Sequence, residues 1–408
     1  MWNSFRPARK ATCICSITMT LVLACGESNK ESDANTQPPI GDEDAATGVE
    51  AGVQDASVNV PDDVPAYIVE ATAGEWTAIG VNTLVDVAFD YDSATTPDGF
   101  RQGLQGIMDA WSGATYAREH HRLYVNGGGH RDYDGNEWYA FDVLAARWER
   151  VNDPSLYLDG TGIDGVFPDG APVPIHTYDA LVYAPSTNSL FRMGKAGSPL
   201  RSIWEFDLDT LRWRDTNAEI RDPHSSSAKW DPATGMIFLF QNSAQASGYG
   251  QFVLFDPQTS TRTPTATHAR IGAITSALDT THGEFVYTGG GIAPIRIDTA
   301  SYVVTEVVTS GDTALEAKGA PGFTYDVRRD RFTGWGAGDD TRTLYHLSRT
   351  DWSWTVETPS SGAVPGAPNT NGIFGRFQYV PEYDVMILAT TVSGPVMMYK
   401  PLDWSPPS

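Results

Sequence analysis

Cysteine is almost absent from this chain of 408 residues, which contains only Cys13, Cys15 and Cys25. Because all three lie near the N-terminus, the rest of the sequence can form neither an internal disulfide nor a cysteine nucleophile. The local signatures of common catalytic sites are missing as well: there is no Gly-x-Ser-x-Gly elbow, His-Glu-x-x-His zinc motif, phosphate-binding loop or dinucleotide fingerprint. The sequence therefore offers no motif from which an activity can be named.

Positive charge is also scarce. The chain has 28 Lys and Arg against 51 Asp and Glu, which gives a formal net charge of -23 at pH 7. A chain this acidic repels the phosphate backbone of a nucleic acid instead of displacing counterions from it. We therefore expect no nucleic-acid partner.

Long hydrophobic runs are missing too. The longest apolar stretch, Ala11 to Ala24, is shorter than the roughly 20 residues that a membrane-spanning helix needs. It follows a basic start that contains Arg6 and Arg9, as the apolar core of a signal peptide does. The stretch ends Val22-Leu23-Ala24-Cys25-Gly26, which resembles a bacterial lipoprotein signal.

That resemblance implies cleavage before Cys25, lipidation of its thiol, and loss of Cys13 and Cys15 with the signal. Because Gly26 follows the cysteine where an Asp would favour the inner membrane, it also implies anchoring in the cell envelope at the outer membrane. An ordinary secretory signal is the alternative.

The segment from 26 to 65 contains ten Asp and Glu, one Lys and no aromatic residue. A segment of this composition cannot bury a core, so it is expected to be a disordered acidic tether. We therefore divide the chain into a signal peptide at 1–24, a tether at 25–65 and one folded domain at 66–408, and expect a monomer.

The folded part repeats one pattern six times. Each copy starts at an aromatic or apolar residue, here called the mark residue, and the six mark residues are Tyr116, Tyr183, Trp230, Leu278, Tyr325 and Tyr379. A turn and two short apolar strands follow each mark, and most copies add an Asp and a Trp. The steps between 183, 230, 278 and 325 are nearly equal, which is typical of a repeat architecture. Strands this short, separated by turn residues, predict one four-stranded antiparallel sheet per copy.

The pattern resembles the kelch family of β-propellers. The matching residues are Gly127-Gly128, Tyr139 and Trp148 in the first copy, and Trp204 and Trp213 in the second. The resemblance implies an all-β propeller over roughly residues 105 to 404 and no particular activity. The glycine pair is expected to let the second strand approach the crowded inner part of the ring. The Cys–Tyr copper site of galactose-oxidase-like propellers is excluded, because the propeller has no cysteine.

Six copies predict six blades. The last copy reaches Trp404 without an outer strand, whereas residues 74–79 resemble the outer-strand segment 147–151. We therefore expect the N-terminal segment to complete the last blade and close the ring, which hides the edge strands. A seventh blade is the alternative, if residues 80–108 contain a further degenerate copy.

A candidate ligand site follows from aligning the copies. The innermost strands of a propeller all start at one mouth of the tunnel, and a polar residue precedes each mark by six to eight positions: Asp109, His176, His224, Arg270, Lys318 and Asn371. The insertions 152–175 and 358–370 and the loop 130–137 open at the same mouth. Long loops on a rigid scaffold commonly carry function, so we add His130, Arg131 and Tyr133 to the predicted site. The alternative is a water-filled mouth that is polar for that reason alone.

The loop 130–137 also carries Asp132, Asp134, Asn136 and Glu137, whose oxygens could bind Ca²⁺. An ordinary solvated hairpin loop explains these residues equally well. We expect no cofactor and no other metal.

The function predicted from these features is binding of an extracellular carbohydrate or protein ligand at one tunnel mouth. Basic groups at that mouth would favour an anionic ligand such as a uronate glycan. The alternative is a polysaccharide lyase, in which His130, His176 and Tyr178 would serve as base and acid and Arg270 or Lys318 would neutralise the developing enolate.

Overall fold

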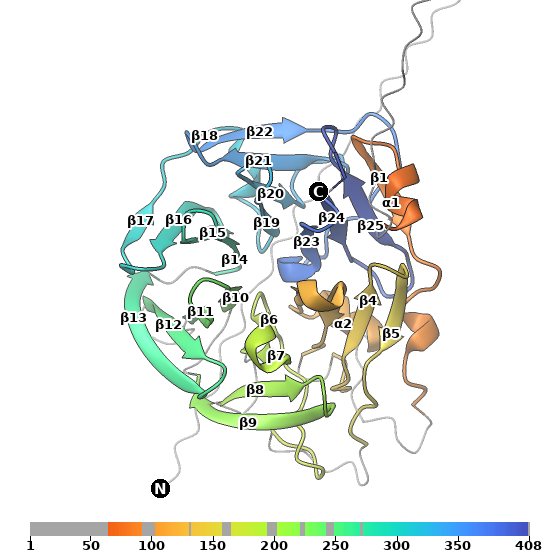
Figure 1. Ribbon diagram of the computed structural model, residues 1–408, viewed down its shortest axis with the longest axis vertical. Helices are drawn as coiled ribbons and strands as arrows, with labels where there is room; N and C mark the ends of the chain where they lie inside the picture. The colour runs from red at the N-terminus through yellow and green to blue at the C-terminus, as the bar shows by residue number, and fades with distance from the viewer. Residues whose placement is uncertain are drawn as a thin grey trace, which may run out of the picture. The chain divides into compact units, whose positions relative to one another are not determined.

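The computed structural model describes residues 64–91, 103–129, 132–156, 165–193, 202–220, 225–241, 249–269 and 272–406. In this part of the chain six antiparallel sheets surround a common axis (Figure 1), which confirms the predicted all-β propeller with six blades. The described residues between 80 and 108 form helical turns and no strand, so they add no seventh blade. The predicted signal peptide, Cys25 and nearly all of the predicted tether lie outside the described residues.

The first three blades follow one another along the chain, each listed from its innermost strand outward. Blade 1 is β2 (Ala114–Ala117), β3 (Arg122–Val125), β4 (Tyr139–Asp142) and β5 (Arg147–Arg150). Blade 2 is β6 (Leu181–Ala184), β7 (Ser189–Arg192), β8 (Ser202–Asp207) and β9 (Arg212–Glu219). Blade 3 is β10 (Ser227–Asp231), β11 (Met236–Gln241), β12 (Tyr249–Asp256) and β13 (Thr261–Ala269).

The remaining blades repeat this order until the last strand. Blade 4 is β14 (Thr275–Asp279), β15 (Glu284–Gly289), β16 (Ile292–Asp298) and β17 (Val304–Glu306). Blade 5 is β19 (Gly322–Asp326), β20 (Arg331–Trp335), β21 (Leu344–Ser348) and β22 (Ser353–Glu357), with β18 (Ser310–Gly311) pairing parallel to β22. Blade 6 is β23 (Phe377–Val380), β24 (Val385–Leu388), β25 (Val396–Lys400) and β1 (Glu75–Ile79).

Among the described residues, helical structure is confined to short connections. These are α1 (Ala66–Glu70), η1 (Val85–Val87), η2 (Gly103–Gln105), α2 (Gly106–Asp109), η3 (Arg118–His120), η4 (Pro185–Thr187), η5 (Thr313–Leu315) and η6 (Phe374–Arg376). None of the helices in the described ranges is long and apolar enough to cross a membrane.

The ring is closed by its N-terminal strand, as predicted. Strand β1 pairs antiparallel with β25 from Glu75 opposite Lys400 to Ile79 opposite Val396. Trp76 on β1 is 1% exposed, and its indole Nε1 donates to the carbonyl oxygen of Arg342 in blade 5 at 2.8 Å. The first described strand therefore covers the last blade and ties it to the blade before it.

The Asp and Trp of the repeat have separate structural roles. The Asp142 carboxylate accepts a hydrogen bond from the main-chain nitrogen of Ala145 at 2.9 Å, which caps the turn between the two outer strands. Trp148 on the outermost strand is 1% exposed and packs in one core with Val385 and Ile387 of blade 6. The Trp therefore fills the space between adjacent blades.

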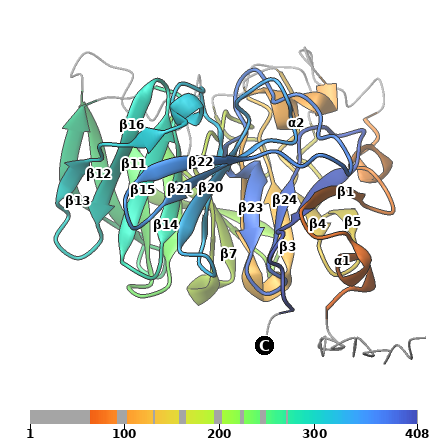
Figure 2. The ribbon, with the colours of Figure 1, turned by 90° about the horizontal axis from the view of Figure 1, so that it is seen from above.

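The two ends of the ring differ. At the loop mouth the innermost strands begin, and α2 lies there along the upper edge in Figure 2. At the turn mouth the innermost strands end in short turns.

Gly127 to Gly129 belong to the loop mouth and not to a strand, because β3 ends at Val125. The expected role of these glycines inside the second strand is therefore wrong. They are needed for packing at the loop mouth, because a Cβ on Gly129 would lie 2.2 Å from the ring of His176.

Candidate functional site

A cavity of about 420 Å³ lies along the axis of the propeller, and all six innermost strands line it. Exposed residues of the turn mouth form its rim, among them Arg118, Glu119, Pro232 and Val327. The cavity therefore opens at the turn mouth, on the side of the ring opposite the long loops. We refer to it as the central channel.

The loop mouth is closed by a small apolar plug. Tyr178, Ala320 and Phe374 are at most 5% exposed and pack together with Ala273. These four residues precede the innermost strands of four different blades, and η6 lies against β2, β14 and β19 on other sides of the axis. The plug therefore spans the axis, and in the part of the chain that the structure describes the channel has one open end.

A repeated backbone feature places the plug. In each blade the residue five positions before the mark residue has a left-handed backbone conformation, with φ between 49 and 56° except for 45° at Ala320. These residues are Trp111, Tyr178, Ser225, Ala273, Ala320 and Phe374. Non-glycine residues pay about 1–2 kcal/mol for this conformation. These left-handed residues are held by main-chain hydrogen bonds between blades. For example, Tyr178 N donates to Trp111 O at 2.7 Å, and Ala320 N donates to Ala273 O at 2.6 Å.

The floor of the channel is polar. Asp179 follows the plug residue Tyr178, and its side chain is fully buried. One carboxylate oxygen accepts from Lys229 Nζ at 2.8 Å. The other accepts from the main-chain nitrogen of Ser276 at 2.8 Å and also lies within hydrogen-bond distance of the hydroxyl groups of Ser227 and Ser276. A residue of blade 2 thus joins blades 3 and 4 beneath the cavity.

The walls are lined by the residue immediately before each mark residue. These six residues are Thr115, Val182, Lys229, Ala277, Thr324 and Gln378. Sequence reasoning missed them. The signal was nevertheless present, because the mark residue is aromatic in five of the six copies whereas the preceding position differs between most of them.

The aromatic mark residues also line the channel, and hydrogen bonds fix the four tyrosines among them; the Tyr116 hydroxyl donates to Glu382. Tyr183, Tyr325 and Tyr379 each donate to a side chain five residues later, respectively to Asn188 at 3.2 Å, Asp330 at 2.7 Å and Asp384 at 2.8 Å. Each of these three acceptors is a left-handed residue of the turn that follows. The rings are therefore held rigidly at the open end of the channel.

Two of the predicted site residues, Asp109 and Asn371, lie together at the loop mouth. Asn371 Nδ2 donates to the Asp109 carbonyl oxygen at 2.8 Å, and the side chain of Asn369 donates to the Asp109 carboxylate. Fully buried Arg376 donates to Asn369 Oδ1 at 2.7 Å and to the carbonyl oxygen of Ser112 at 3.0 Å. Burial lowers the pKa of Arg376 to about 9, against the opposing effect of Asp109. These contacts fasten blade 6 to blade 1.

His176 and Tyr178 are also neighbours, with ring centroids 6.0 Å apart. His176 is 6% exposed, packs on the half-exposed ring of Trp111, and places Nε2 3.4 Å from Asp132 Oδ2. Tyr178 belongs to the plug, and burial raises its pKa to about 12. Its phenol therefore holds its proton at neutral pH.

The other predicted site residues are distributed as follows. Lys318 is half-buried in the segment before β19, and no contact found in the described residues joins it to Asp109, His176 or Asn371. His130, Arg131, His224 and Arg270 lie outside the described residues, so their part in a loop-mouth site stays a prediction.

Two of the candidate calcium ligands, Asn136 and Glu137, already make hydrogen bonds within the protein. Asn136 Oδ1 accepts from the main-chain nitrogen of Ser155 at 2.8 Å. Glu137 is 1% exposed and accepts hydrogen bonds from the hydroxyl groups of Tyr133 and Tyr139, the latter at 2.7 Å. These oxygens are engaged in holding the loop, and calcium binding stays a prediction.

Burial raises the pKa of Glu137, although the hydroxyls of Tyr133 and Tyr139 oppose the shift. A carboxyl whose pKa is higher in the folded than in the unfolded chain stabilises the fold fully below the unfolded value of about 4.3. This stabilisation is lost as the pH rises through the raised pKa. Each pH unit between the two values lowers the free energy of unfolding by about 1.4 kcal/mol.

We expect Glu137→Gln to remove this dependence, because the amide keeps an acceptor for the tyrosine hydroxyls and carries no charge. Urea unfolding of the wild type and the variant at several pH values measures the effect. The variant should match the wild type in acid and become more stable than it as the pH rises. Glu70→Gln, at an exposed glutamate, is the control. A difference between wild type and Glu137→Gln that does not change with pH would contradict the assignment.

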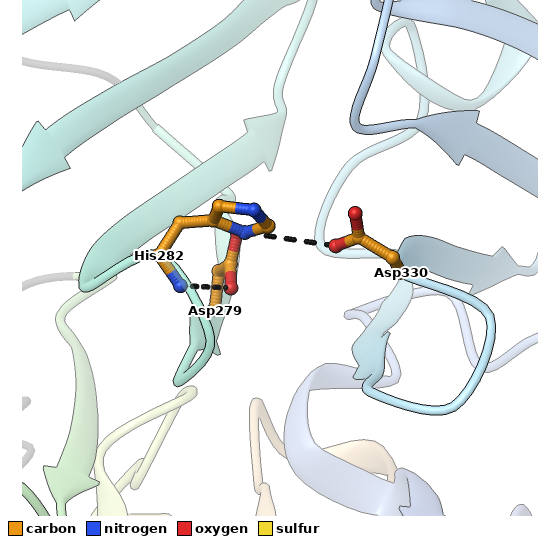
Figure 3. Close-up of side chains that lie close together, drawn as sticks. All are labelled: Asp279, His282 and Asp330. Atoms are coloured by element: carbon orange, nitrogen blue, oxygen red, sulfur yellow. Dashed lines mark hydrogen bonds and ion pairs between the residues drawn. The ribbon is translucent and has the colours of Figure 1, made fainter.

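A group of charged side chains at the turn mouth has the composition of a metal site. Figure 3 shows His282 between Asp279 and Asp330, with Nδ1 2.8 Å from Asp279 Oδ2 and 3.6 Å from Asp330 Oδ1. However, Arg349 Nε donates to the same Asp279 oxygen at 2.9 Å, and Asp279 Oδ1 accepts from two main-chain nitrogens. The carboxylate is therefore already saturated by donors, and the group acts as an ion-pair link between blades 4 and 5.

Comparisons with known proteins support no functional assignment. No protein-family model matches the chain, so the kelch resemblance stays a prediction, and no curated protein matches it in sequence. Among solved structures the chain is similar to a structural genomics protein of unknown function from Bacteroides thetaiotaomicron VPI-5482. That likeness has a TM-score of 0.47 and 12% identity and covers 80% of this chain and 75% of that one. The channel and its lining are therefore the basis for a proposal of function.

Proposed function

We propose that the propeller binds an extracellular carbohydrate in its central channel and that the ligand enters through the turn mouth. The observation that supports this proposal is a cavity of about 420 Å³ with one open end, formed by all six blades. A cavity of this volume falls within the range of about 300–1,000 Å³ that is usual for small-ligand sites. Its single mouth favours a ligand that enters end-on, such as the terminus of a glycan chain.

The chemistry of the lining favours a sugar. Tyr116 and Trp230 are among the residues that line the channel, and aromatic rings are suited to pack against the C–H groups of a pyranose. Thr115, Thr324 and Gln378 add hydroxyl and amide groups, which can pair with sugar hydroxyls as donors and acceptors. A protein ligand would bind to an exposed surface and not inside a channel, so a protein is the less favoured partner.

This location differs from the one expected from the sequence. Tyr178 and Phe374 fill the axis at the loop mouth, whereas the cavity opens at the turn mouth. The lyase alternative is less favoured for a related reason, because Tyr178 is buried in the plug and would have to act as acid or base from there. We therefore propose a binding protein and not a lyase.

A titration of the full chain with a panel of oligosaccharides, followed by calorimetry, tests carbohydrate binding. We expect saturable binding of at least one glycan at one site per chain. If no member of a panel spanning neutral and uronate glycans binds, the proposal fails. The appearance of unsaturated uronate absorbance during incubation would favour the lyase.

We also propose that the propeller is anchored in the cell envelope, at the outer membrane, through a lipid on Cys25. This rests on the lipoprotein-like sequence that ends at Gly26. We expect Cys25→Ala to abolish incorporation of labelled palmitate and to release the protein from the membrane fraction. Cys13→Ala is the matched control and should retain both properties. Labelled Cys25→Ala protein would show that the anchor is elsewhere.

A further inference from the structure

We propose that the ligand is an uncharged, hydroxyl-rich saccharide and that the ammonium group of Lys229 at the channel floor is its main polar contact. This inference rests on the proposed carbohydrate binding and names the class of sugar. It departs from the anionic glycan that the basic residues of the sequence favoured. The observation that supports this class of sugar is the balance of charge in the channel.

The charged residues that line the channel carry no excess of positive charge once their partners are included. On the rim, Arg118 is 66% exposed and its Nε is 3.6 Å from a Glu382 carboxylate oxygen, and the neighbouring Glu119 is negative. Lys229 is the one charged residue of the described lining that lies deeper, on strand β10. Its Nζ is 2.8 Å from Asp179 Oδ1, so its charge is balanced in place.

Asp179 cannot leave this pair. Its side chain has no exposed surface, and its second oxygen accepts from Ser276 N and lies near two serine hydroxyls. Its main chain is held as well, because its nitrogen donates to Ser226 O at 3.2 Å and its oxygen accepts from Ala228 N at 2.8 Å. A buried carboxylate fixed in this way would be left unpaired if an anionic ligand drew Lys229 away, which is costly.

Lys229 still has donors to offer. An ammonium group carries three N–H donors, and Asp179 accepts one of them. The side chain is 19% exposed and lines the cavity, so the other two can reach a ligand there. Sugar hydroxyl oxygens accept such hydrogen bonds without bringing a second negative charge next to Asp179.

The remaining polar groups of the wall match the same ligand. Gln378 Nε2 donates to the carbonyl oxygen of Gly375 at 2.7 Å, which leaves its Oε1 as an acceptor for a hydroxyl. The Thr115 and Thr324 hydroxyl oxygens accept from main-chain nitrogens, at 3.1 and 3.2 Å, so their own protons remain to be donated. The channel thus presents donors and acceptors around a neutral centre.

The test compares a lysine that lines the channel with one at the loop mouth that does not. Binding of neutral cello- and malto-oligosaccharides and of oligogalacturonates of equal length is measured for the wild type, Lys229→Met and Lys318→Met. We expect the wild type to prefer a neutral oligosaccharide by at least about tenfold, and Lys229→Met to weaken that binding by about tenfold, as loss of a charge-assisted hydrogen bond does. Lys318→Met, at the loop mouth, should change it by less than about twofold.

A salt titration of the wild type needs no variant and guards against misfolding of Lys229→Met. Binding of the neutral oligosaccharide should be unchanged between about 0.05 and about 0.5 M NaCl, because no net charge is screened. A wild type that prefers oligogalacturonate, or a loss caused by Lys318→Met and not by Lys229→Met, would overturn the inference and leave carbohydrate binding intact. Absence of binding to every saccharide would instead overturn the proposed function.

Discussion

Replacing Trp76 by alanine is expected to lower the free energy of unfolding by about 3–5 kcal/mol, the usual cost of deleting a fully buried large aromatic side chain. Trp76 is 1% exposed and packs on Tyr399 with ring centroids 5.4 Å apart. Its indole also donates to Arg342 O of blade 5. The change removes these contacts from the strand that closes the ring, so no other part of blade 6 can replace them.

Urea unfolding monitored by circular dichroism measures this effect. Thr77→Ala is the matched control, because Thr77 is the next residue of β1, half-exposed, and pairs with Met398 through the same main-chain register. It should cost no more than about 1 kcal/mol, the span of strand propensities. Equal losses for the two variants would mean that strand pairing, and not the indole, closes the ring.

Replacing Gln378 by tryptophan is expected to weaken saccharide binding by at least about a hundredfold, or ~2.8 kcal/mol. Gln378 is half-buried and lines the channel, so the indole would occupy space that the ligand needs. The fold should tolerate the change, because the side chain lost makes one hydrogen bond, to Gly375 O, worth about 1 kcal/mol.

Calorimetry with the glycan that binds the wild type best gives the affinity, and thermal unfolding shows whether the variant is folded. Lys318→Trp adds the same side chain at the loop mouth and serves as the control. We expect it to bind like the wild type. If Lys318→Trp loses binding while Gln378→Trp keeps it, the ligand site is at the loop mouth and the channel is not used.

Much of the fold could be predicted because its signals are local. The Asp that ends the third strand in blades 1 to 4 caps a turn only a few residues later, as Asp142 does for Ala145. The position of the Trp that follows is set by the hairpin of the two outer strands. Trp148 therefore reaches the gap between blades through local structure alone. The spare strand around Trp76 was recognisable because an outer strand has its own local pattern.

The site could not be predicted in the same way, because it depends on contacts between distant parts of the chain. Asp179 and Ser276 meet at the channel floor although they are 97 positions apart. Tyr178 and Phe374 close the loop mouth because the backbone before their strands takes positive φ values of 50° and 53°. Neither Tyr nor Phe is a residue type that favours positive φ. The apolar plug at the loop mouth could therefore not be predicted from the sequence, which suggested a polar ring there.

The sequence by itself determined the number of blades, the closing strand and the place of each mark residue, because repeated short-range patterns dictate strands and turns. Only the tertiary structure decided which end of the ring is open. That depends on which side chains six blades bring to one axis. The packing of Tyr178 against Phe374 closes the loop mouth, and the pairing of Lys229 with Asp179 next to this plug gives the channel a neutral floor. The repeat fixes where the channel runs, and the residues that differ between its copies set what the channel can bind.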